Sequence, residues 1–341
     1  MTERIETNCP ECADPAPSLD RRNFIRVVGA AAAVAATVGI PAVVRARREQ
    51  AKPAEALILE LFSGLDDEQK KKVVLPFDHT INKGGTPTRL GMYNEAAAKV
   101  KISSVYTKKQ QELIDRIVRA MAGGEEGYKC LSRGGTWDGS HALENCGSLL
   151  FGEPGEGKKY AWLFSGHHLT IRADGDFMDG AAWGGPMYYG HSPNGYLPGN
   201  IFNFQTKSVL EVAKALDEKQ MKKAVVVGTP GELAPSIKFR KPGEEMPGIL
   251  AKELSKDQQA LIEKVMRDLI SPYRKEDGDE VMAALKANGG LEKIHLAFYR
   301  DKDAKDNERW HFWRLEGPTF VWNYRVLPHV HCYVNIASSP S

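Results

Sequence analysis

The chain has 341 residues, of which 42% are hydrophobic and 26% are charged, a composition typical of a globular protein rather than a disordered or fibrous one. Its 46 Lys and Arg nearly balance 44 Asp and Glu, and the net charge is +2. The chain therefore lacks the basic field on which nucleic-acid binding usually depends. Five cysteines are too few for a fold built on disulfides.

The first 46 residues have the pattern of an export signal. Arg21 and Arg22 precede an Ala, Gly and Val run over residues 27–44, and small residues follow near Ala46. This order resembles a twin-arginine signal peptide. We therefore expect the twin-arginine translocase to deliver the protein to the periplasm or the exterior. If the leader is retained, we expect it to anchor the protein in the membrane. Because that route carries folded proteins, a metal could be captured in the cytoplasm, where copper is scarce.

The remaining chain is predicted to be one domain. We assign residues 47–60 to a linker, residues 61–336 to a single α+β domain and residues 337–341 to a tail. Cys130, Cys146 and Cys332 lie in this part of the chain. Cys130 and Cys146 could pair, but the sequence does not decide whether they do.

Four segments share one helix-start pattern, a capping residue three positions before a glutamine with an apolar or aromatic residue just ahead. The pairs are Asp66/Gln69, Thr107/Gln110, Asp217/Gln220 and Ser255/Gln258. After two of them, residues 111–121 and 259–270 carry the apolar stripe of an amphipathic helix. An old duplication could explain the similarity, but we prefer the simpler explanation that the same capping signals recur.

Two groups of short segments read as strands separated by turns. The segments are 148–151, 159–164, 168–172 and 176–181 in the first group, and 293–299, 310–315, 319–325 and 329–334 in the second. The turns between them favour antiparallel hairpins. We therefore predict an α+β fold, with antiparallel sheets from two strand groups and several capped amphipathic helices packed on them.

One motif imitates a phosphate-binding loop. Residues 152–158 match its Gly-x4-Gly-Lys part, but Lys159 stands where a hydroxyl residue should hold Mg²⁺, and a strand follows instead of a helix. We interpret this segment as a hairpin turn and predict no nucleotide. Cys9 and Cys12 form a Cys-x-x-Cys pair, but no histidine directly follows Cys12 as in a c-type haem motif, so we also predict no haem.

Histidines give the sharpest chemical signal. His329 and His331 are two apart on a predicted strand, so their imidazoles share one face. Adjacent His167 and His168 should point to opposite faces, so at most one of them joins the same site. Either motif alone is more simply structural, but together they supply enough ligands for a three-histidine metal site with an open position. Glu144, Asp179 and Glu316 are carboxylate candidates by proximity alone.

The glycines gather near the same motif, with 18 of the 32 between positions 121 and 200. We interpret residues 183–195 as a Gly-rich loop whose Tyr188, Tyr189 and His191 are candidates for binding a substrate. An ordered surface loop is the simpler alternative. Arg314 or Arg325, among the aromatic residues of the second strand group, could bind an anionic substrate.

The chain resembles a known family at these residues. The resemblance rests on Phe164-Ser-Gly-His-His-Leu169, on Gly185-Pro-Met-Tyr-Tyr-Gly190, and on Arg314-Leu-Glu-Gly-Pro-Thr-Phe320 leading to His329-Val-His331. These motifs are similar to those of the exported bacterial proteins called domain of unknown function 3500, over most of residues 60–336. The resemblance implies that the histidine constellation is a family feature, and it implies nothing about substrate.

The expected function is that of an exported metal-binding protein acting on a small-molecule substrate or ligand. Its metal would be a divalent ion of zinc, iron, manganese or copper. Zinc would favour a hydrolase and a redox-active metal an oxidoreductase. The alternative is a non-catalytic periplasmic binding protein in which the histidines are structural.

Overall fold

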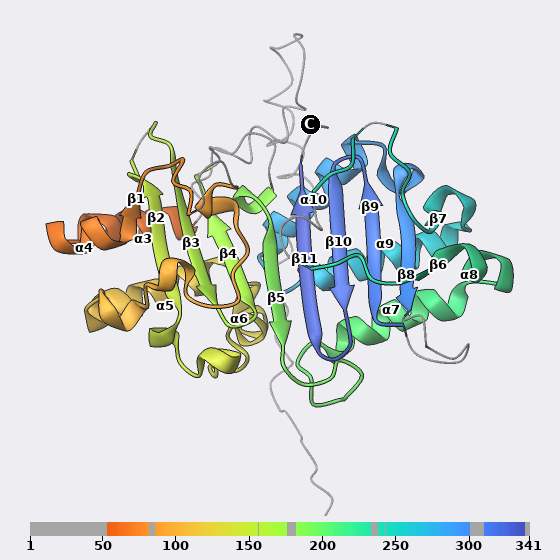
Figure 1. Ribbon diagram of the computed structural model, residues 1–341, viewed down its shortest axis with the longest axis horizontal. Helices are drawn as coiled ribbons and strands as arrows, with labels where there is room; N and C mark the ends of the chain where they lie inside the picture. Colours follow the sequence, from red (N-terminus) through yellow and green to blue (C-terminus); the bar gives the residue numbers. More distant parts are fainter. Residues whose placement is uncertain are drawn as a thin grey trace, which may run out of the picture. The chain divides into compact units, whose positions relative to one another are not determined.

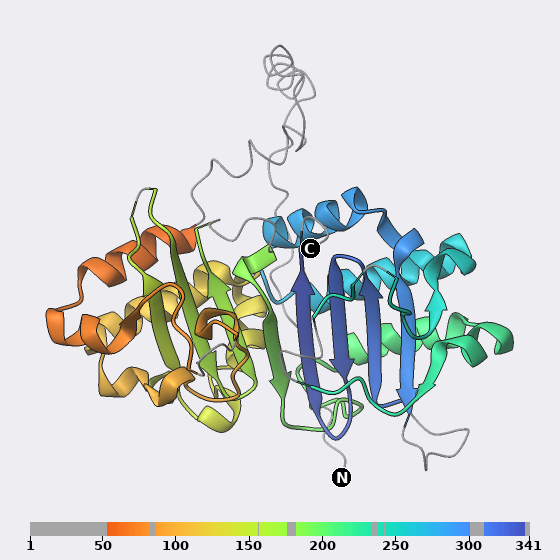
Figure 2. The same cartoon turned by 45° about the horizontal axis from the view of Figure 1, so that its top comes forward.

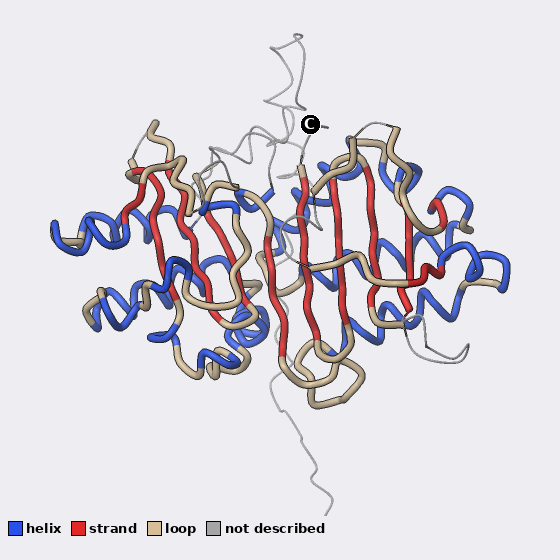
Figure 3. Tube along the Cα trace, viewed as in Figure 1, coloured by secondary structure: helices blue, strands red, loops and turns tan. Residues whose placement is uncertain are grey.

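The computed structural model describes residues 53–81, 86–155, 157–175, 182–232, 238–241, 243–300 and 310–337. The twin-arginine segment, with Arg21 and Arg22, and the predicted strand 176–181, with Asp179, lie outside these residues. Figures 1 and 3 show one broad sheet with helices behind it and long loops crossing its front face. Among the described helices, none is both long and apolar enough to span a bilayer.

The prediction of an α+β fold is confirmed, but the prediction of separate antiparallel sheets is wrong. The strands of the described residues form one mixed sheet of 11 strands, in which ten follow the order β1-β2-β3-β4-β5-β11-β10-β9-β8-β6 and β7 pairs with β8. The strands are β1 (Val74–Leu75), β2 (Gly147–Gly152), β3 (Tyr160–Gly166), β4 (Leu169–Ala173), β5 (Met187–His191), β6 (Val225–Val227), β7 (Ile249–Leu250), β8 (His295–Arg300), β9 (Phe312–Gly317), β10 (Phe320–Arg325) and β11 (Val330–Ile336).

Two features of the sheet were not predicted from the sequence. The short edge strands β1 and β6 directly follow helices and pair in parallel with β2 and β8, since a helical connection returns the chain in the same direction. The Gly-rich stretch 183–195, interpreted as a loop, contains β5, which pairs with β4 on one side and β11 on the other. This strand joins the two predicted strand groups into one sheet.

All four predicted helix starts are confirmed. Asp66, Thr107, Asp217 and Ser255 each accept from the backbone three residues on, and the glutamine there returns the bond. They begin α4 (Asp67–Val73), α5 (Lys108–Met121), α8 (Glu218–Ala224) and α9 (Lys256–Ile270). The remaining α-helices of the described chain are α3 (Pro53–Ser63), α6 (Gly124–Ser132), α7 (Asn203–Ala215) and α10 (Lys275–Ala287). Residues 53–60, assigned to the linker, are part of α3, whose Ile58 and Leu61 are fully buried.

The fold repeats itself. A helix pair (α3–α4, then α7–α8) leads to a parallel edge strand, a longer capped helix (α5, then α9), and four antiparallel strands (β2–β5, then β8–β11). The equivalent residues Asp66 and Asp217 are 151 positions apart (217 − 66), as are Val74 and Val225 (225 − 74). The sheet order is accordingly symmetric about the β5–β11 pair. Shared capping signals alone do not produce this common topology, so the structure favours the duplication that we had set second.

The two faces of the sheet have different chemistry. Tyr189 on β5 and Tyr324 on β10 are fully buried on the helix side, where their hydroxyl groups bond to residues of α7 and α9. Tyr188, next to Tyr189, lies on the opposite face, since successive side chains of a strand alternate. That face is crossed by the loop before α5 and the loop after β6 (Figure 2). Asn94 in the first loop bonds to Tyr188, and Glu232 in the second bonds to Tyr333. The polar chemistry therefore collects under the crossing loops.

The structure also answers the questions left by the cysteines and by the segment that imitates a phosphate-binding loop. Cys130, Cys146 and Cys332 are free thiols, so the pairing left open for Cys130 and Cys146 is not formed. Strands β2 and β3 flank the Gly-x4-Gly-Lys segment as an antiparallel pair, with Gly152 opposite Tyr160. The segment is the hairpin connection that its sequence predicted.

Candidate metal centre

The structure brings His168, His329 and His331 together. The Nε2 atom of His329 lies 3.1 Å from Nε2 of His168 and 2.9 Å from Nε2 of His331. His331 lies on β11 and His329 immediately before it, two residues apart and on one face as predicted. This group could hold a metal ion, because nitrogens at zinc bond lengths of 2.0–2.1 Å in a tetrahedral site are about 3.3 Å apart.

His168 comes from a turn rather than from a strand. His167 and His168 form the two-residue connection between β3 and β4, and His168 has a left-handed backbone with φ of 52°. The peptide N–H of His168 donates to Oδ1 of Asn94 at 2.6 Å, and its carbonyl accepts from Arg133 and from Gly190 N–H. A left-handed conformation of a residue with a side chain is costly and persists where its surroundings enforce it. These bonds fix the His168 ring over β11.

Gly190 on β5 makes room for that ring. A Cβ at this position would lie 2.3 Å from the carbonyl oxygen of Val330, 3.1 Å from the His331 ring and 3.3 Å from Cβ of His168. Only glycine permits the turn and the strand to approach this closely. The glycine of the Gly-Tyr-rich segment is thus part of the construction of the site.

Two carboxylates orient the outer nitrogens of the imidazoles. Nδ1 of His168 lies 2.7 Å from Oδ2 of Asp138, and Nδ1 of His331 lies 2.7 Å from Oε1 of Glu232. A ring whose Nδ1–H donates to a carboxylate keeps a lone pair on Nε2, which is the usual arrangement around a metal-binding histidine. The hydrogen-bond network therefore directs the Nε2 lone pairs of both rings toward the centre.

Arg325 closes the other side of the group. Its Nη2 lies 2.9 Å from Nε2 of His329 and 2.7 Å from Nε2 of His331, so it donates to these lone pairs. Nη1 of Arg325 pairs with Oε2 of Glu232 at 2.5 Å, and its Nε donates to the carbonyl of His329. The guanidinium and the imidazoles thus form one network, which is buried except for the half-buried His329.

The electrostatics keep the imidazoles neutral. Burial, assisted by the charge of Arg325, lowers the pKa of His329 to about 4. Burial also lowers the pKa of His331 to about 4 and outweighs the opposing hydrogen bond to Glu232. The pKa of His168 is likewise lowered by burial. Burial alone would raise the pKa of Asp138, but hydrogen bonds from His168 and Ser192 hold it well below its usual range. The site presents neutral nitrogens beside ionised carboxylates at pH 7.

Several predicted site residues lie elsewhere. His167 accepts from Gly139 N–H through its Nδ1, at 3.0 Å; it is not in the group of His168, His329 and His331, but it belongs with Asp138 and His168 to a second group that could hold a metal ion. His191 accepts from the N–H of Ile201 and fastens the loop after β5. Arg314 is buried against Glu316 and Asn323, while Tyr189 faces the helices. Of the substrate candidates that we named, Tyr188 lies beside the histidines, with its ring centroid 5.3 Å from that of His331.

The carboxylates at the site were not the ones named from the sequence. Glu144 pairs with Lys108 on the surface, and Glu316 pairs with Arg314 and Arg240. Asp138 and Glu232 were missed because they lie 30 and 99 positions from their histidine partners. No local spacing could have revealed them. Arg325 had been considered together with Arg314, and the structure places Arg325 at the site.

A cavity of about 610 Å³ opens beside the histidines. Its lining includes His331, Arg325 and Glu232, together with Tyr188 and Tyr333. Its volume is that of a site for a small organic molecule. This cavity gives the histidine group access to a ligand.

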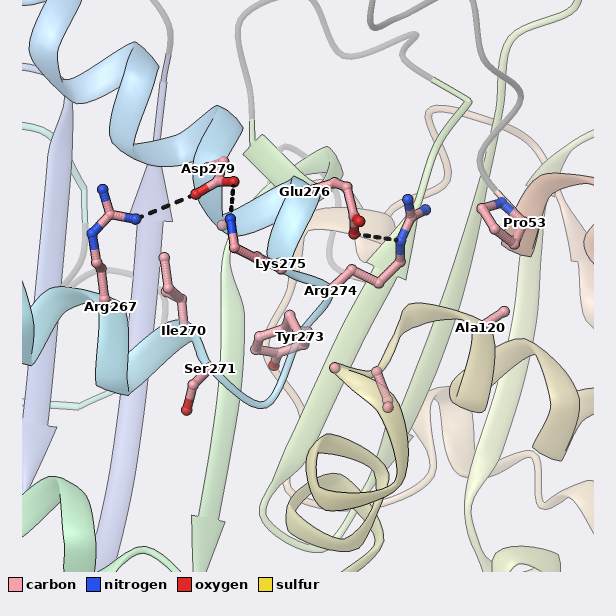
Figure 4. Close-up of a pocket in the computed structure, with 14 residues that line it drawn as sticks. Pro53, Ala120, Arg267, Ile270, Ser271, Tyr273, Arg274, Lys275, Glu276 and Asp279 are labelled. Atoms are coloured by element: carbon pink, nitrogen blue, oxygen red, sulfur yellow. Dashed lines mark hydrogen bonds and ion pairs between the residues drawn. The ribbon is translucent and has the colours of Figure 1, made fainter. Parts of the chain in front are cut away.

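A second cavity, of about 630 Å³, lies on the helix side between the end of α5 and the turn from α9 to α10. Figure 4 shows that its charged side chains already pair with one another: Arg267 and Lys275 with Asp279, and Arg274 with Glu276. The cavity beside the histidines therefore offers the richer chemistry.

Comparison with known proteins extends the assignment only to a family. No curated protein and no solved structure matches the chain. The family described as "Protein of unknown function (DUF3500)" matches residues 47–335. The chain therefore belongs to this family, as its His-His and His-x-His motifs had indicated.

Proposed function

We propose that this protein is an exported metal-dependent enzyme whose metal ion is bound by Nε2 of His168, His329 and His331. The convergence of the three Nε2 atoms carries the proposal, because Asp138 and Glu232 leave lone pairs on the Nε2 atoms of His168 and His331. Nε2 of His329 lies 3.1 and 2.9 Å from these two atoms, and its one proton can satisfy at most one of the two lone pairs, so an electrophile shared by all three nitrogens is favoured. A divalent cation supplies that electrophile.

The cavity supports catalysis over a purely structural metal. Three protein ligands leave an open coordination position, whereas structural zinc sites are closed by four. The cavity reaches the group along His331, so water or substrate has access to that position. A zinc ion lowers the pKa of its bound water to about 7 and would supply a nucleophile for hydrolysis. Iron, manganese or copper would direct the same site toward oxidation.

Folding before export supports zinc, iron or manganese over copper. Copper binds nitrogen ligands more tightly than the other divalent ions, so a site filled outside the cell would select it. A chain folded in the cytoplasm and exported through Arg21 and Arg22 would carry its metal with it. Replacement of both arginines by lysine, followed by fractionation of cells, tests this route. Unchanged delivery of the variant outside the cytoplasm would contradict it.

One observation favours a second candidate function. The donation from Arg325 to His329 and His331 satisfies both lone pairs without any metal. In that case the protein is a binding protein, and the histidines shape its cavity as structural residues.

Metal analysis distinguishes the two functions. We expect the mature protein, isolated without a tag and dialysed extensively, to retain about one equivalent of metal per chain. The His329→Ala/His331→Ala variant should lose that metal. His79→Ala is a matched control, because the His79 ring bonds to Thr88 away from the centre. Substoichiometric metal in all three proteins, with equal stability, would favour the binding protein.

A further inference from the structure

The cavity beside the histidines has an apolar and aromatic lining with few charges. Its wall residues include Met92, Tyr93, Tyr188, Phe312 and Tyr333. Among the described residues that line it, the charged side chains are Arg325 and Glu232, which pair with each other. A ligand of this cavity therefore has an organic body, and Arg325 is the one cation that the described part of the lining offers it.

Arg325 depends on the same lone pairs that a metal ion would take. Its Nη2 donates to Nε2 of His329 and of His331. A metal bound to those nitrogens leaves the hydrogens of Nη2 without acceptors. The guanidinium cannot simply leave, since it is 8% exposed and its Nε and Nη1 remain bonded to the carbonyl of His329 and to Glu232. A buried donor in this position needs a new acceptor.

The charges around the centre also require an added group, in this case an anion. Two guanidinium groups, of Arg133 and Arg325, lie around the centre with two carboxylates, of Asp138 and Glu232. A divalent metal ion therefore adds two positive charges that no described side chain at the site offsets. A cation placed beside a guanidinium is repelled unless an anion lies between them.

We propose, on the basis of the metal centre proposed above, that the site binds an organic monocarboxylate. One carboxylate oxygen occupies the open metal position, and the other accepts from Nη2 of Arg325, whose planar fork suits this geometry. The apolar body of the ligand packs against the aromatic wall. Inorganic phosphate is disfavoured, because it has no apolar body to pack against the aromatic wall.

The proposal requires metal and carboxylate to strengthen each other's binding. The anion restores an acceptor to Arg325 and screens it from the metal, and linkage makes the effect equal in both directions. Coupling between two ligands typically amounts to about 5–150-fold in affinity. We therefore expect benzoate to tighten metal binding by roughly tenfold.

Cobalt(II), whose visible absorption reports its ligands, provides the test. The apoprotein is titrated with Co²⁺ alone, with benzoate, with the uncharged isostere benzamide, and with inorganic phosphate. We expect benzoate to tighten Co²⁺ binding and to change the Co²⁺ spectrum, and benzamide to do neither. Equal Co²⁺ affinity with and without benzoate would overturn the carboxylate proposal while leaving the metal centre intact. A stronger effect of phosphate than of benzoate would overturn the choice of a carboxylate, and failure to bind Co²⁺ at all would overturn the proposed function as well.

Two variants locate the coupling. Arg325→Gln should bind Co²⁺ more tightly than the native protein in the absence of benzoate, because the repelling charge is gone, and benzoate should no longer improve binding. Arg314→Gln is the matched control, since Arg314 is also buried but is paired with Glu316 on β9; it should retain the native coupling. Loss of coupling in both variants, or in neither, would overturn the role of Arg325. The titrations of the native protein remain decisive if a variant does not fold.

Discussion

Nδ1 of His168 and Oδ2 of Asp138 lie 2.7 Å apart, although the two residues are 30 positions apart in the chain. Asp138 also accepts from the N–H and the hydroxyl of Ser192, at 3.1 and 2.6 Å. The carboxylate is therefore held from two sides and in turn holds the His168 ring. Through this bond, Asp138 fixes both the tautomer and the direction of the Nε2 lone pair.

Removal of this carboxylate should weaken metal binding without unfolding the protein. We expect Asp138→Ala to lower metal affinity by about 10–100-fold, the usual effect of losing a partner that orients a ligating histidine. Ser192→Ala is the control, since it removes one donor to Asp138 but leaves the bond to His168. Calorimetric metal titrations of both variants measure the difference. Equal affinities for Asp138→Ala and the native protein would show that His168 needs no orienting partner.

Gly190 gives a prediction about packing. An alanine there places its Cβ 2.3 Å from the carbonyl oxygen of Val330 and against the rings of His168 and His331. Because backbone has to move, we expect Gly190→Ala to lower the free energy of unfolding by about 1–3 kcal/mol and to reduce metal binding. Gly199→Ala is a matched control, as its Cβ would meet nothing within 4 Å; its effect should be within about 0.5 kcal/mol. Denaturant unfolding of the two variants tests the contrast, which disappears if Gly190 has no special role.

Local signals in the sequence were enough for the helices and most strands. Each capping box is complete within four residues, so Asp66-x-x-Gln69 specifies its helix start without tertiary information. The joining strand β5 could not be found in this way. Its residues Tyr188 to Gly190 resemble a glycine-rich loop, and only pairing with β4 and β11, distant in sequence, makes them a strand.

The site shows the same limit. His329 and His331 could be assigned to one face because a strand alternates with period two. Whether His167 or His168 joins the site is decided by the left-handed turn at His168, and a strand pattern does not predict such a turn. Asp138, in a short 3₁₀ turn, and Glu232, between β6 and β7, reach the site from loops. Long-range contacts of this kind leave no spacing in the sequence.

The neutral histidines predict how stability depends on pH in metal-free protein. Burial lowers the pKa of His331 to about 4 in the folded state, whereas an unfolded histidine titrates near 6.5. Between these values the unfolded chain binds more protons, so stability is full above about pH 6.5 and falls as the pH approaches 4. From pH 7.5 to 5 we expect His331 to contribute a loss of roughly 2 kcal/mol. Urea unfolding in the presence of a chelator measures it, and His331→Gln should show a correspondingly shallower decline.

The repeated halves make a prediction about paired glutamines. The side chains of Gln69 and Gln110 bond to each other reciprocally at 2.8 and 3.0 Å, while each also completes its own capping box. Gln220 and Gln258 repeat this arrangement at 3.1 and 2.7 Å. Double-mutant cycles with alanine should therefore give a coupling of about 0.5–1.5 kcal/mol in each half, and the two values should agree within about 0.5 kcal/mol. A coupling near zero in one half would mean that the shared geometry does not carry the same energy.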